Sequence, residues 1–419
     1  MRILMVCDFY APFVGGVEQH VRHLAAGLSD RGHQVAVATS WAQGLERFER
    51  DGPVSVYRIP VTTGRLEGLF ASGSRRWSPP WPDPEGMWCL RRIIASEHPH
   101  IIHGHDWLGR SCLPLKPGSG AKFVASLHYY TLSCAKKTLI YHGEPCTGPG
   151  FRKCLECASL HYGPGKGIPI TLGNWVGEAL ERQTVDMFLP VSRATAAANG
   201  LVKGQVPFEV IPNFVPDEID RSDQPIASYL AQLPAEPFLL YVGVLTHYKG
   251  VNVLLQSYTQ LSNAPPLVLI APTLEGVALD IPSYVTVLSS CPHAAVMEAW
   301  HRSMIAIAPS LWPEPCATVV LEAMVQGKPV IATNTGGMPD MIEDGVSGIL
   351  VPPGDAHALR NAMELLISDA RLRNAMGQSA SKRVRAFQAS AVIPRIERVY
   401  SRLMDSGAGA GTDLEEYSP

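Results

Sequence analysis

The sequence predicts an α/β protein composed of two doubly wound domains that face each other. Its 419 residues exceed the usual size of one domain, and two domains of about 200 residues are the natural division. Two series of short apolar strands alternate with amphipathic helical segments, as in parallel sheets covered by helices. Between the two series, prolines and acidic residues interrupt residues 209–225, which is typical of a linker.

The first forty residues form a strand–loop–helix–strand unit. The apolar run RILMVC precedes the loop FYAPFVGG, and the next segment carries Val17, Val21, Leu24 and Leu28 on one helical face. HQVAVATS is predicted as the second strand. A βαβ unit of this kind has a right-handed crossover and a parallel sheet. Further strands are predicted at residues 54–59, 100–105, 122–127 and 186–192.

The alternation restarts after the linker. We expect strands at residues 238–243, 266–271, 285–290, 305–310, 329–333 and 347–353, and helices at 250–261, 293–302 and 317–326. The predicted organisation is an N-terminal domain at 1–212 with a cysteine-rich loop at 128–175, a C-terminal domain at 213–390, a helix at 391–404 that packs back on the N-terminal domain, and a flexible tail at 405–419.

The composition excludes several classes of protein. Hydrophobic residues make up 46% and charged residues 17%, which indicates a folded chain with a large core. The formal net charge of −3 gives no positive field for nucleic acid, so no nucleic-acid partner is expected. No apolar stretch approaches the roughly 18 residues needed to span a membrane. The run before Asp8 is too short for a signal peptide, and we expect a cytoplasmic protein.

Three loops lie where open parallel sheets bind ligands, beyond the carboxyl ends of their strands. Gly15 and Gly16 separate the first strand from the first helix, where free backbone N–H groups could hold a phosphate. The spacing lacks the dinucleotide pattern G-x-G-x-x-G, so a simple tight turn is equally consistent with it. In the second domain, Gly243 and Lys249 flank a similar loop. Lys249 could bind a phosphate at the following helix, or it could be an ordinary solvated lysine.

The stretch PSLWPEPCATVVLEAM places Glu314 and Glu322 on either side of a predicted helix start. Pro315 suits the first helical position, which leaves Glu314 in the loop and directed into the cleft. The helix start at Ala317, Thr318 and Val319 is a candidate anion site. Two carboxylates beside it would repel a phosphate but could accept hydrogen bonds from hydroxyls, which indicates sugars joined to phosphates. Glu322 could equally lie on the solvent face of an amphipathic helix.

Four of the nine cysteines, Cys134, Cys146, Cys154 and Cys157, fall within 24 residues. In a reducing compartment, such a cluster favours metal ligation over disulfides, and four thiolates would complete a tetrahedral zinc site. The surrounding segment contains glycine and proline and lacks the periodicity of a packed element. A structural zinc ion would explain how the loop stays ordered, whereas the alternative is four unbridged thiols.

Several blocks resemble those of the family 4 retaining glycosyltransferases. The segment PSLWPEPCATVVLEAMVQGKPVIATNTGGMPDMIEDGVSGILVPPGD is similar, almost residue for residue, to the donor-binding signature of that family. FYAPFVGGVEQHVRHLAAGLSDRGHQVAVAT, IIHGHDWLG, LPVSRATAAA, VIPNFV and YVGVLTHYKG resemble its other blocks, in the same order. The match covers most of residues 1–370. It implies the GT-B fold, with two Rossmann-like domains facing an interdomain cleft, the nucleotide-sugar in the second and the acceptor in the first.

The resemblance also implies roles for individual residues. Glu322 would accept hydrogen bonds from the ribose, Glu314 from the donor sugar, and Lys249 would bind the diphosphate. N–H groups near Gly16 and Thr318 would hold phosphate oxygens. His128 matches a histidine beside the transferred sugar, and Asp106 matches a residue of the acceptor side. The family needs no metal for catalysis, because cationic groups and helix ends stabilise the leaving group.

Three departures from the family pattern stand out. Val244 replaces an arginine that binds phosphate in many members, and Arg193 or His247 is a candidate substitute. Cys316-Ala317 replaces a common Phe-Gly pair, and the added methyl group could narrow the sugar pocket. IPNFV replaces the common IPNGV, which we expect to matter little because it lies near the linker.

The resulting hypothesis is a retaining glycosyltransferase that moves a hexose-type sugar from a UDP- or GDP-sugar to an acceptor hydroxyl. The acceptor would be a glycan, a lipid-linked molecule or a small molecule, and a lipid-linked acceptor would bring a peripheral contact with a membrane. The alternatives are a nucleotide-sugar epimerase or hydrolase on the same fold, and a catalytically weakened sugar-nucleotide-binding protein.

Overall fold

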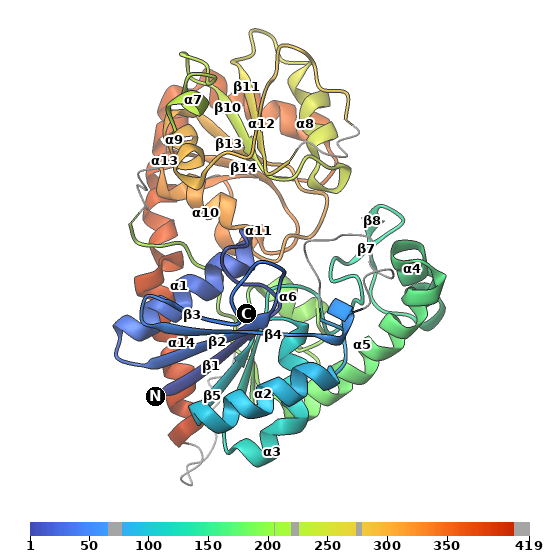
Figure 1. Ribbon diagram of the computed structural model, residues 1–419. Helices are drawn as coiled ribbons and strands as arrows, with labels where there is room; N and C mark the ends of the chain where they lie inside the picture. Colours follow the sequence, from blue (N-terminus) through green and yellow to red (C-terminus); the bar gives the residue numbers. More distant parts are fainter. Residues whose placement is uncertain (66–77, 205, 219–225, 274–278, 406–419) are drawn as a thin grey trace.

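The structure is a computed structural model that describes residues 1–65, 78–204, 206–218, 226–273 and 279–405. Two parallel sheets, each covered by helices on both faces, form an N-terminal domain and a C-terminal domain (Figure 1). This architecture confirms the predicted fold class of two doubly wound α/β domains.

The N-terminal sheet has seven strands in the order β3-β4-β2-β1-β5-β6-β9. Every neighbouring pair is parallel except β3 and β4, which are antiparallel. The strands are β1 (Arg2–Cys7), β2 (Gln34–Ser40), β3 (Phe48–Asp51), β4 (Val54–Ile59), β5 (Ile101–Gly104), β6 (Lys122–Leu127) and β9 (Met187–Pro190). The central strands are almost fully buried because helices cover both of their faces.

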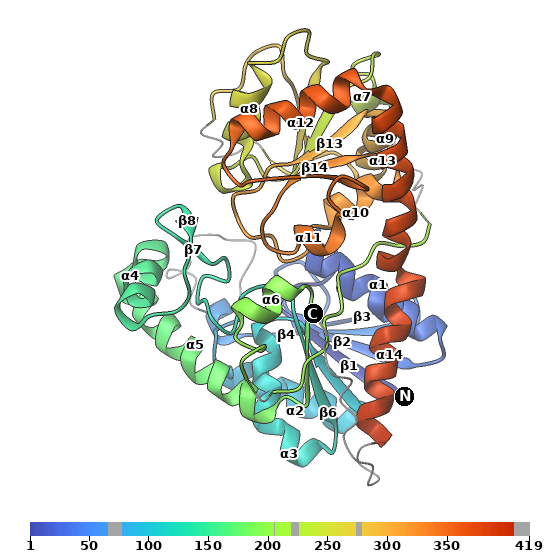
Figure 2. The ribbon, with the colours of Figure 1, turned by 180° about the vertical axis from the view of Figure 1, so that it is seen from behind.

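Alternation along β1 divides the N-terminal core into two layers. Met5 packs in one layer, under α1 (Gly16–Asp30) and α14 (Ala389–Asp405). Leu4 packs in the other layer, under α2 (Pro84–Glu97) and the 3-10 helix η3 (Trp107–Leu115). The last helix of the described chain therefore completes the N-terminal domain, and Figure 2 shows α14 running down its side.

The C-terminal sheet is entirely parallel, in the order β12-β11-β10-β13-β14-β15. Its strands are β10 (Leu239–Val242), β11 (Leu267–Ala271), β12 (Thr286–Ser289), β13 (Ile305–Ala308), β14 (Val330–Thr333) and β15 (Gly348–Val351). Helices α9 (His293–Arg302), α10 (Thr318–Val325) and α13 (Ala370–Arg383) cover one face. Helices α8 (Val251–Tyr258) and α12 (Ala356–Ser368) cover the other.

Two helix starts differ from their predictions. Helix α10 begins at Thr318, so Pro315 lies in the loop and not at the first helical position. Helix α8 begins at Val251 because Gly250 has a φ of 73° and its Cα faces the Pro309 carbonyl oxygen, to which an added Cβ would come within 1.8 Å. This position requires glycine.

The remaining elements lie in the segments that connect these strands and helices. They are η1 (Thr62–Arg65), α3 (Lys116–Ser119), β7 (Ile140–Tyr141), β8 (Glu144–Pro145), α4 (Phe151–Tyr162), α5 (Pro164–Thr184), α6 (Arg193–Ala198), α7 (Ala227–Leu230), η4 (His247–Lys249), α11 (Met338–Met341) and η5 (Val384–Phe387). Within the described residues, no helix is both long enough and apolar enough to cross a membrane.

Candidate active site

Lys249 and Glu314 meet at the carboxyl edge of the C-terminal sheet. Lys249 ends η4, after β10, and Glu314 lies in the loop after β13. The Lys249 ammonium pairs with Glu314 Oε1 and lies 4.7 Å from the centroid of the Trp312 ring. Neighbouring parallel strands bring these two residues together, although 65 residues separate them in the sequence.

The Glu314 carboxylate is held firmly in place and is only 8% exposed. Ser310 Oγ donates to Glu314 Oε1 at 2.8 Å, and Thr333 in turn donates to the Ser310 carbonyl oxygen at 2.6 Å. The backbone N–H of Gly337 donates to the Glu314 carbonyl oxygen at 2.7 Å. A Cβ on Gly336 would approach that oxygen to 2.3 Å, so the second glycine pair allows two loops to pack closely.

Glu322 lies one helical turn into α10, at 17% side-chain exposure. Its Oε1 lies 3.1 Å from Nε2 of His293, at the start of α9. No side chain caps the first N–H groups of α10, where Ala317 is the N-cap and Thr318 and Val319 follow. Uncapped N–H groups at a helix start attract anions, so the carboxylate of Glu322 and a candidate phosphate site lie on one short helix.

The starts of helices α1 and α10 approach each other across the junction between the two domains. A Cβ placed on Gly16 would lie 3.8 Å from Thr318 Oγ1, so the start of α1 faces the start of α10. Gly15 is the N-cap of α1, so its residue offers no side chain to cap this helix start. The Glu18 carboxylate lies close to Gly15. The two glycines and Thr318 therefore lie close together at the junction.

Val244 stands where the family resemblance predicts a phosphate-binding arginine. Its side chain is partly exposed in the loop after Gly243. Gly243 has a φ of 156°, and Tyr241 donates a hydrogen bond across it to the Val244 carbonyl oxygen at 2.8 Å. Of the two candidate substitutes, His247 is exposed in η4. Arg193 is 70% exposed and pairs at 3.4 Å with Asp340 of α11, so it lies at the same junction with an acidic partner.

His128 lies at the end of β6 and is buried. Its Nδ1 is 2.9 Å from Asn213 Oδ1, and its Nε2 is 3.1 Å from Nδ1 of His105. Burial lowers the pKa of His128 to about 4, while the hydrogen bond to Asn213 opposes this shift. The imidazole is therefore neutral at pH 7.

Asn213 connects His128 to the loop between Glu314 and α10, since its Nδ2 donates to the Cys316 carbonyl oxygen at 3.4 Å. The neighbouring Phe214 packs on the ring of His20 at a centroid distance of 4.7 Å. The IPNFV segment therefore contacts the candidate site, although it was expected to matter little because it lies near the linker. The linker passes through the site, and Phe214 occupies space that a glycine would leave open.

Asp106 is buried next to a lysine that sequence reasoning missed. Lys137 Nζ lies 3.6 Å from Asp106 Oδ1 and 3.5 Å from Asp8 Oδ2, and 4.1 Å from the centroid of the Trp107 ring. Burial raises the pKa of Asp106, Lys137 opposes this shift, and Asp8 adds to it. Lys137 has a φ of 66°, and only the fold of its loop brings its ammonium to two carboxylates from distant strand ends.

Among the described residues, one group of three side chains lies close enough together to ligate a metal ion. The ring nitrogens of His20, His105 and His128 lie within 4.8 Å of one another. Because His128 and His105 share a hydrogen bond and His20 packs on the His128 ring at 4.8 Å, the cluster is a packed histidine core beside the acceptor side. The four predicted zinc ligands lie elsewhere, with Cys134 and Cys146 in the segment between β6 and α4 and Cys154 and Cys157 on α4.

We predict that the free energy of unfolding decreases as the pH falls below 6.5. The pKa of His103 is lowered to about 3 by burial, then by His128, and burial also lowers the pKa values of His20 and His105. The unfolded chain titrates near 6.5, so below this pH it binds protons that the folded protein does not. Each such histidine contributes about 1.4 kcal/mol per pH unit.

Urea unfolding at pH 6, 5.5 and 5 measures this slope. His103→Gln should reduce the slope by about 1.4 kcal/mol per pH unit, since it removes one titrating group. His357→Gln changes an exposed histidine and is the control. Equal slopes for the wild type and His103→Gln would contradict the prediction.

Comparisons with known proteins agree with this fold. The model of the glycosyl transferases group 1 matches residues 230–383, and that of glycosyltransferase family 4 matches residues 14–219. The two doubly wound α/β domains have the GT-B architecture. Since the two models together span most of the chain, the protein belongs to this family of glycosyltransferases and is a transferase enzyme.

Named relatives extend over nearly the whole chain. The D-inositol 3-phosphate glycosyltransferase of Corynebacterium jeikeium is 29% identical, covering 97% of this chain and 98% of that protein. The phosphatidyl-myo-inositol mannosyltransferase of Mycolicibacterium smegmatis is 26% identical, covering 98% and 95%. The structure of Anabaena Alr3699/HepE with UDP-glucose has a TM-score of 0.63 at 16% identity, covering 96% of this chain and 99% of that one.

Proposed function

We propose that the protein transfers a hexose-type sugar from a nucleoside diphosphate sugar to an acceptor hydroxyl, with retention of the anomeric configuration. The observation that carries this proposal is the convergence of Lys249, Glu314 and the uncapped start of α10 on one point of the junction. One cation and one helix start suit a diphosphate. A fixed carboxylate beside them suits the hydroxyls of the attached sugar.

Donor binding would rearrange the ion pair between Lys249 and Glu314. The donor diphosphate offers Lys249 a doubly charged partner, and Glu314 then accepts hydrogen bonds from the sugar while Ser310 keeps its place. Glu322 accepts from the ribose hydroxyls. His128 is neutral and both of its ring nitrogens face neighbours, so its proposed role is to shape the sugar site and not to take a proton.

In the proposed step, the bond between the anomeric carbon and the β-phosphate oxygen breaks, and the acceptor oxygen bonds to the same face of that carbon. The acceptor proton passes to the departing phosphate oxygen. Lys249 and the start of α10 stabilise the charge on the leaving diphosphate. Glycosidases instead use two carboxylates that flank the bond, whereas Glu314 and Glu322 are assigned to binding.

We predict that Val244→Arg raises donor affinity. Val244 is partly exposed at the loop that leads to Lys249, so a longer cationic side chain can reach a bound diphosphate. Calorimetric titration with the nucleoside diphosphate should show an affinity increase of about tenfold, which corresponds to one charge-assisted hydrogen bond. Val346→Arg, at another exposed valine, is the control. Unchanged affinity would mean that other groups already bind the phosphate.

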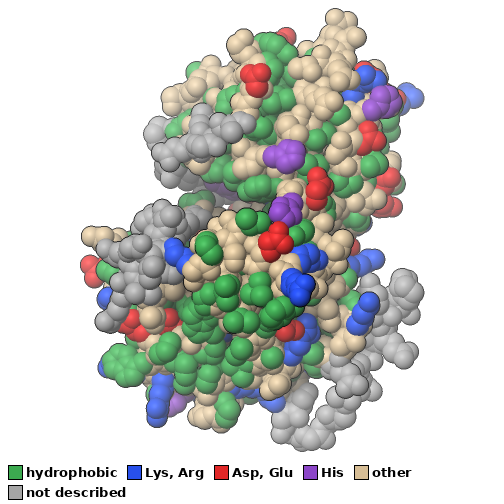
Figure 3. Space-filling model, turned by 90° about the vertical axis from the view of Figure 1, so that its right-hand side faces the viewer, with side chains coloured by type: hydrophobic (Ala, Val, Ile, Leu, Met, Phe, Trp, Pro, Cys, Tyr) green, Lys and Arg blue, Asp and Glu red, His purple; other side chains and the backbone are tan. Residues whose placement is uncertain are grey.

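The acceptor is proposed to be lipid-linked and presented at a membrane surface. Ile168, Leu172 and Val176 form an exposed apolar stripe at spacings of four residues on α5, and Phe151 and Leu160 of α4 are also exposed. Figure 3 shows hydrophobic side chains gathered on the N-terminal half of this side of the molecule. The likeness to a mannosyltransferase named for phosphatidyl-myo-inositol supports the same class of acceptor.

A donor screen followed by an acceptor screen tests the proposed function. A thermal-shift screen of UDP, GDP, ADP and their hexose conjugates identifies the donor, since a ligand of the native state raises Tm. Diphosphate release is then measured with glycans, small molecules and lipid-linked sugars in vesicles. Release that requires the lipid-linked acceptor supports the proposal.

The other outcomes separate the alternatives. Interconversion of the donor without any acceptor would indicate an epimerase, and release without acceptor a hydrolase. Binding with no turnover of any donor would indicate a sugar-nucleotide-binding protein. If a water-soluble acceptor supported the same rate of diphosphate release, the proposal of an acceptor at a membrane surface would be wrong. A cytoplasmic location is part of the proposal, since a reducing compartment keeps thiols available for metal ligation.

A further inference from the structure

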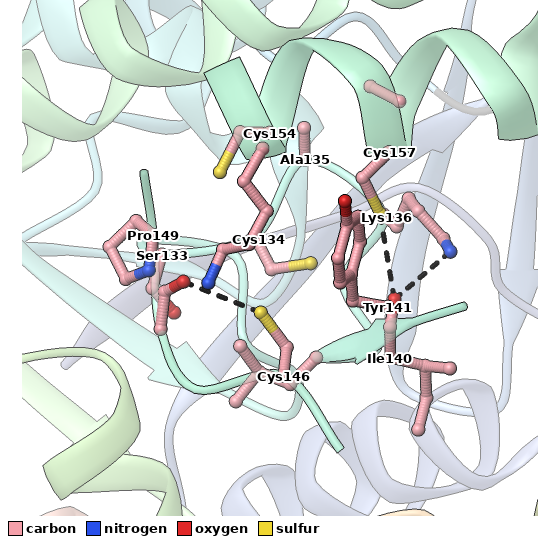
Figure 4. Close-up of a pocket in the computed structure, with 14 residues that line it drawn as sticks. Ser133, Cys134, Ala135, Lys136, Ile140, Tyr141, Cys146, Pro149, Cys154 and Cys157 are labelled. Atoms are coloured by element: carbon pink, nitrogen blue, oxygen red, sulfur yellow. Dashed lines mark hydrogen bonds between the residues drawn. The ribbon is translucent and has the colours of Figure 1, made fainter. Parts of the chain in front are cut away.

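All four clustered cysteines line one small pocket. Cys134 precedes the β7–β8 hairpin, Cys146 follows it, and Cys154 and Cys157 lie one turn apart on α4. The volume of this pocket, counted as the space that the centre of a water molecule can reach, is about 20 Å³. Figure 4 shows the four side chains arranged around it. The fold therefore brings together thiols that are up to 23 positions apart in the sequence.

A backbone N–H group faces one of these sulfur atoms. The N–H of Gly150 donates to Cys154 Sγ at 3.3 Å. Donors of this kind stabilise a thiolate more than a thiol and are typical of the surroundings of metal ligands.

Regular secondary structure contributes little to holding the segment between Cys134 and Cys154. Its two strands, β7 and β8, have two residues each, and Glu144 and Pro145 are exposed. Lys137, Leu139 and His142 all have positive φ values, between 50° and 66°, which costs free energy for residues other than glycine. A bond between the two ends of the segment would compensate for this strain.

We propose that Cys134, Cys146, Cys154 and Cys157 bind one structural zinc ion. Four thiolates match the tetrahedral coordination of zinc, and each thiol releases its proton to solvent as its sulfur bonds to the metal. This inference does not depend on the proposed reaction, since the pocket lies outside the donor site.

Metal binding requires the thiols to rearrange. Cys146 Sγ donates to the Gly148 carbonyl oxygen at 3.4 Å, and Cys157 Sγ to the Ile140 carbonyl oxygen at 3.6 Å. Zinc–sulfur bonds of about 2.3 Å place tetrahedral sulfurs about 3.8 Å apart. Among the described residues the four sulfurs are not gathered as a metal site, so rotation of the cysteine side chains into the pocket would complete it.

The zinc site would position two groups at the domain junction. Three residues after Cys134, Lys137 reaches Asp8 and Asp106. The residue after Lys137 is Thr138, and its carbonyl oxygen accepts a hydrogen bond from Trp312 Nε1 at 2.5 Å. Trp312 belongs to the loop of Glu314. Loss of the metal should therefore loosen the acceptor side and its contact with the donor loop while both domains stay folded.

The test is the metal content of the full-length protein, purified without chelator after growth with zinc. We expect about one zinc per chain by elemental analysis, four thiols that react with a thiol reagent only after chelation, and a cobalt-substituted form with the visible absorption of tetrahedral thiolate coordination. Cys154→Ser with Cys157→Ser should lose the metal. Cys89→Ser with Cys291→Ser, at two partly buried cysteines outside the pocket, should retain it.

A second readout keeps the proposal testable if the double variant is unstable. Chelation of the wild-type protein should make residues 134–157 sensitive to protease, and readdition of zinc should restore resistance. Protein without zinc whose four thiols react freely would overturn the proposal. Iron with acid-labile sulfide, or disulfides among the four cysteines, would overturn it as well.

Discussion

Lys249→Ala is expected to lower kcat/KM for the donor by roughly 30- to 1000-fold. Removal of one preorganised charge donor costs about 2–4 kcal/mol of transition-state stabilisation. The effect should be close to the upper end here, because the phosphate-binding arginine of many family members is replaced by Val244 and Lys249 is the cation closest to Glu314 that the structure describes. The measurement is the initial rate of diphosphate release at low donor concentration.

Two controls separate this effect from a loss of structure. Lys382→Ala removes an exposed lysine at the end of α13 and should leave the rate unchanged. The thermal midpoint of Lys249→Ala shows whether Glu314, which keeps its hydrogen bond from Ser310, tolerates the loss of its cation. A rate loss below tenfold in a stable variant would mean that another group, such as Arg193 or His247, binds the diphosphate.

Glu314→Gln and Glu322→Gln are expected to affect different constants. Glu314→Gln should lower kcat about 10- to 100-fold and leave the affinity for the free nucleoside diphosphate nearly intact, since its partner is the sugar. Glu322→Gln should weaken binding of the free diphosphate by a similar factor, since a carboxylate is the stronger acceptor for ribose hydroxyls. Both changes preserve side-chain shape.

Calorimetric titration and steady-state kinetics on the same preparations distinguish the two roles. Glu298→Gln, on the exposed part of α9, is the matched control. Equal losses of diphosphate affinity in Glu314→Gln and Glu322→Gln would contradict the division between sugar and ribose. Such a result would indicate that Glu314 acts only by holding Lys249 in place.

The sequence was sufficient to predict the fold because its periodicity is local. Short apolar runs separated by amphipathic segments specify parallel strands and covering helices without any long-range information. The same alternation predicted that Lys249 and Glu314 lie at the carboxyl edge of one sheet. Their direct ion pair did not follow from the pattern, because each was assigned to a different part of a bound donor.

The acceptor side was less predictable because its contacts are long-range. Asn213 appeared to belong to a linker, yet it bridges His128 and the Cys316 carbonyl oxygen. Lys137 has no signal beyond its place near Cys134, since its role depends on a left-handed backbone and two distant carboxylates. Pro315 was placed at a helix start by its usual preference, but the contact of this loop with Gly337 delays the helix to Thr318.

The most direct test of the proposed transfer is the configuration of the product. With the donor identified by thermal shift, NMR of the purified product gives the anomeric configuration of the new bond, and a coupled assay gives the amount of diphosphate released. We predict the same configuration as in the donor, with one diphosphate released for each sugar transferred. An inverted linkage, or donor consumption with no transfer to any acceptor, would contradict the proposed reaction.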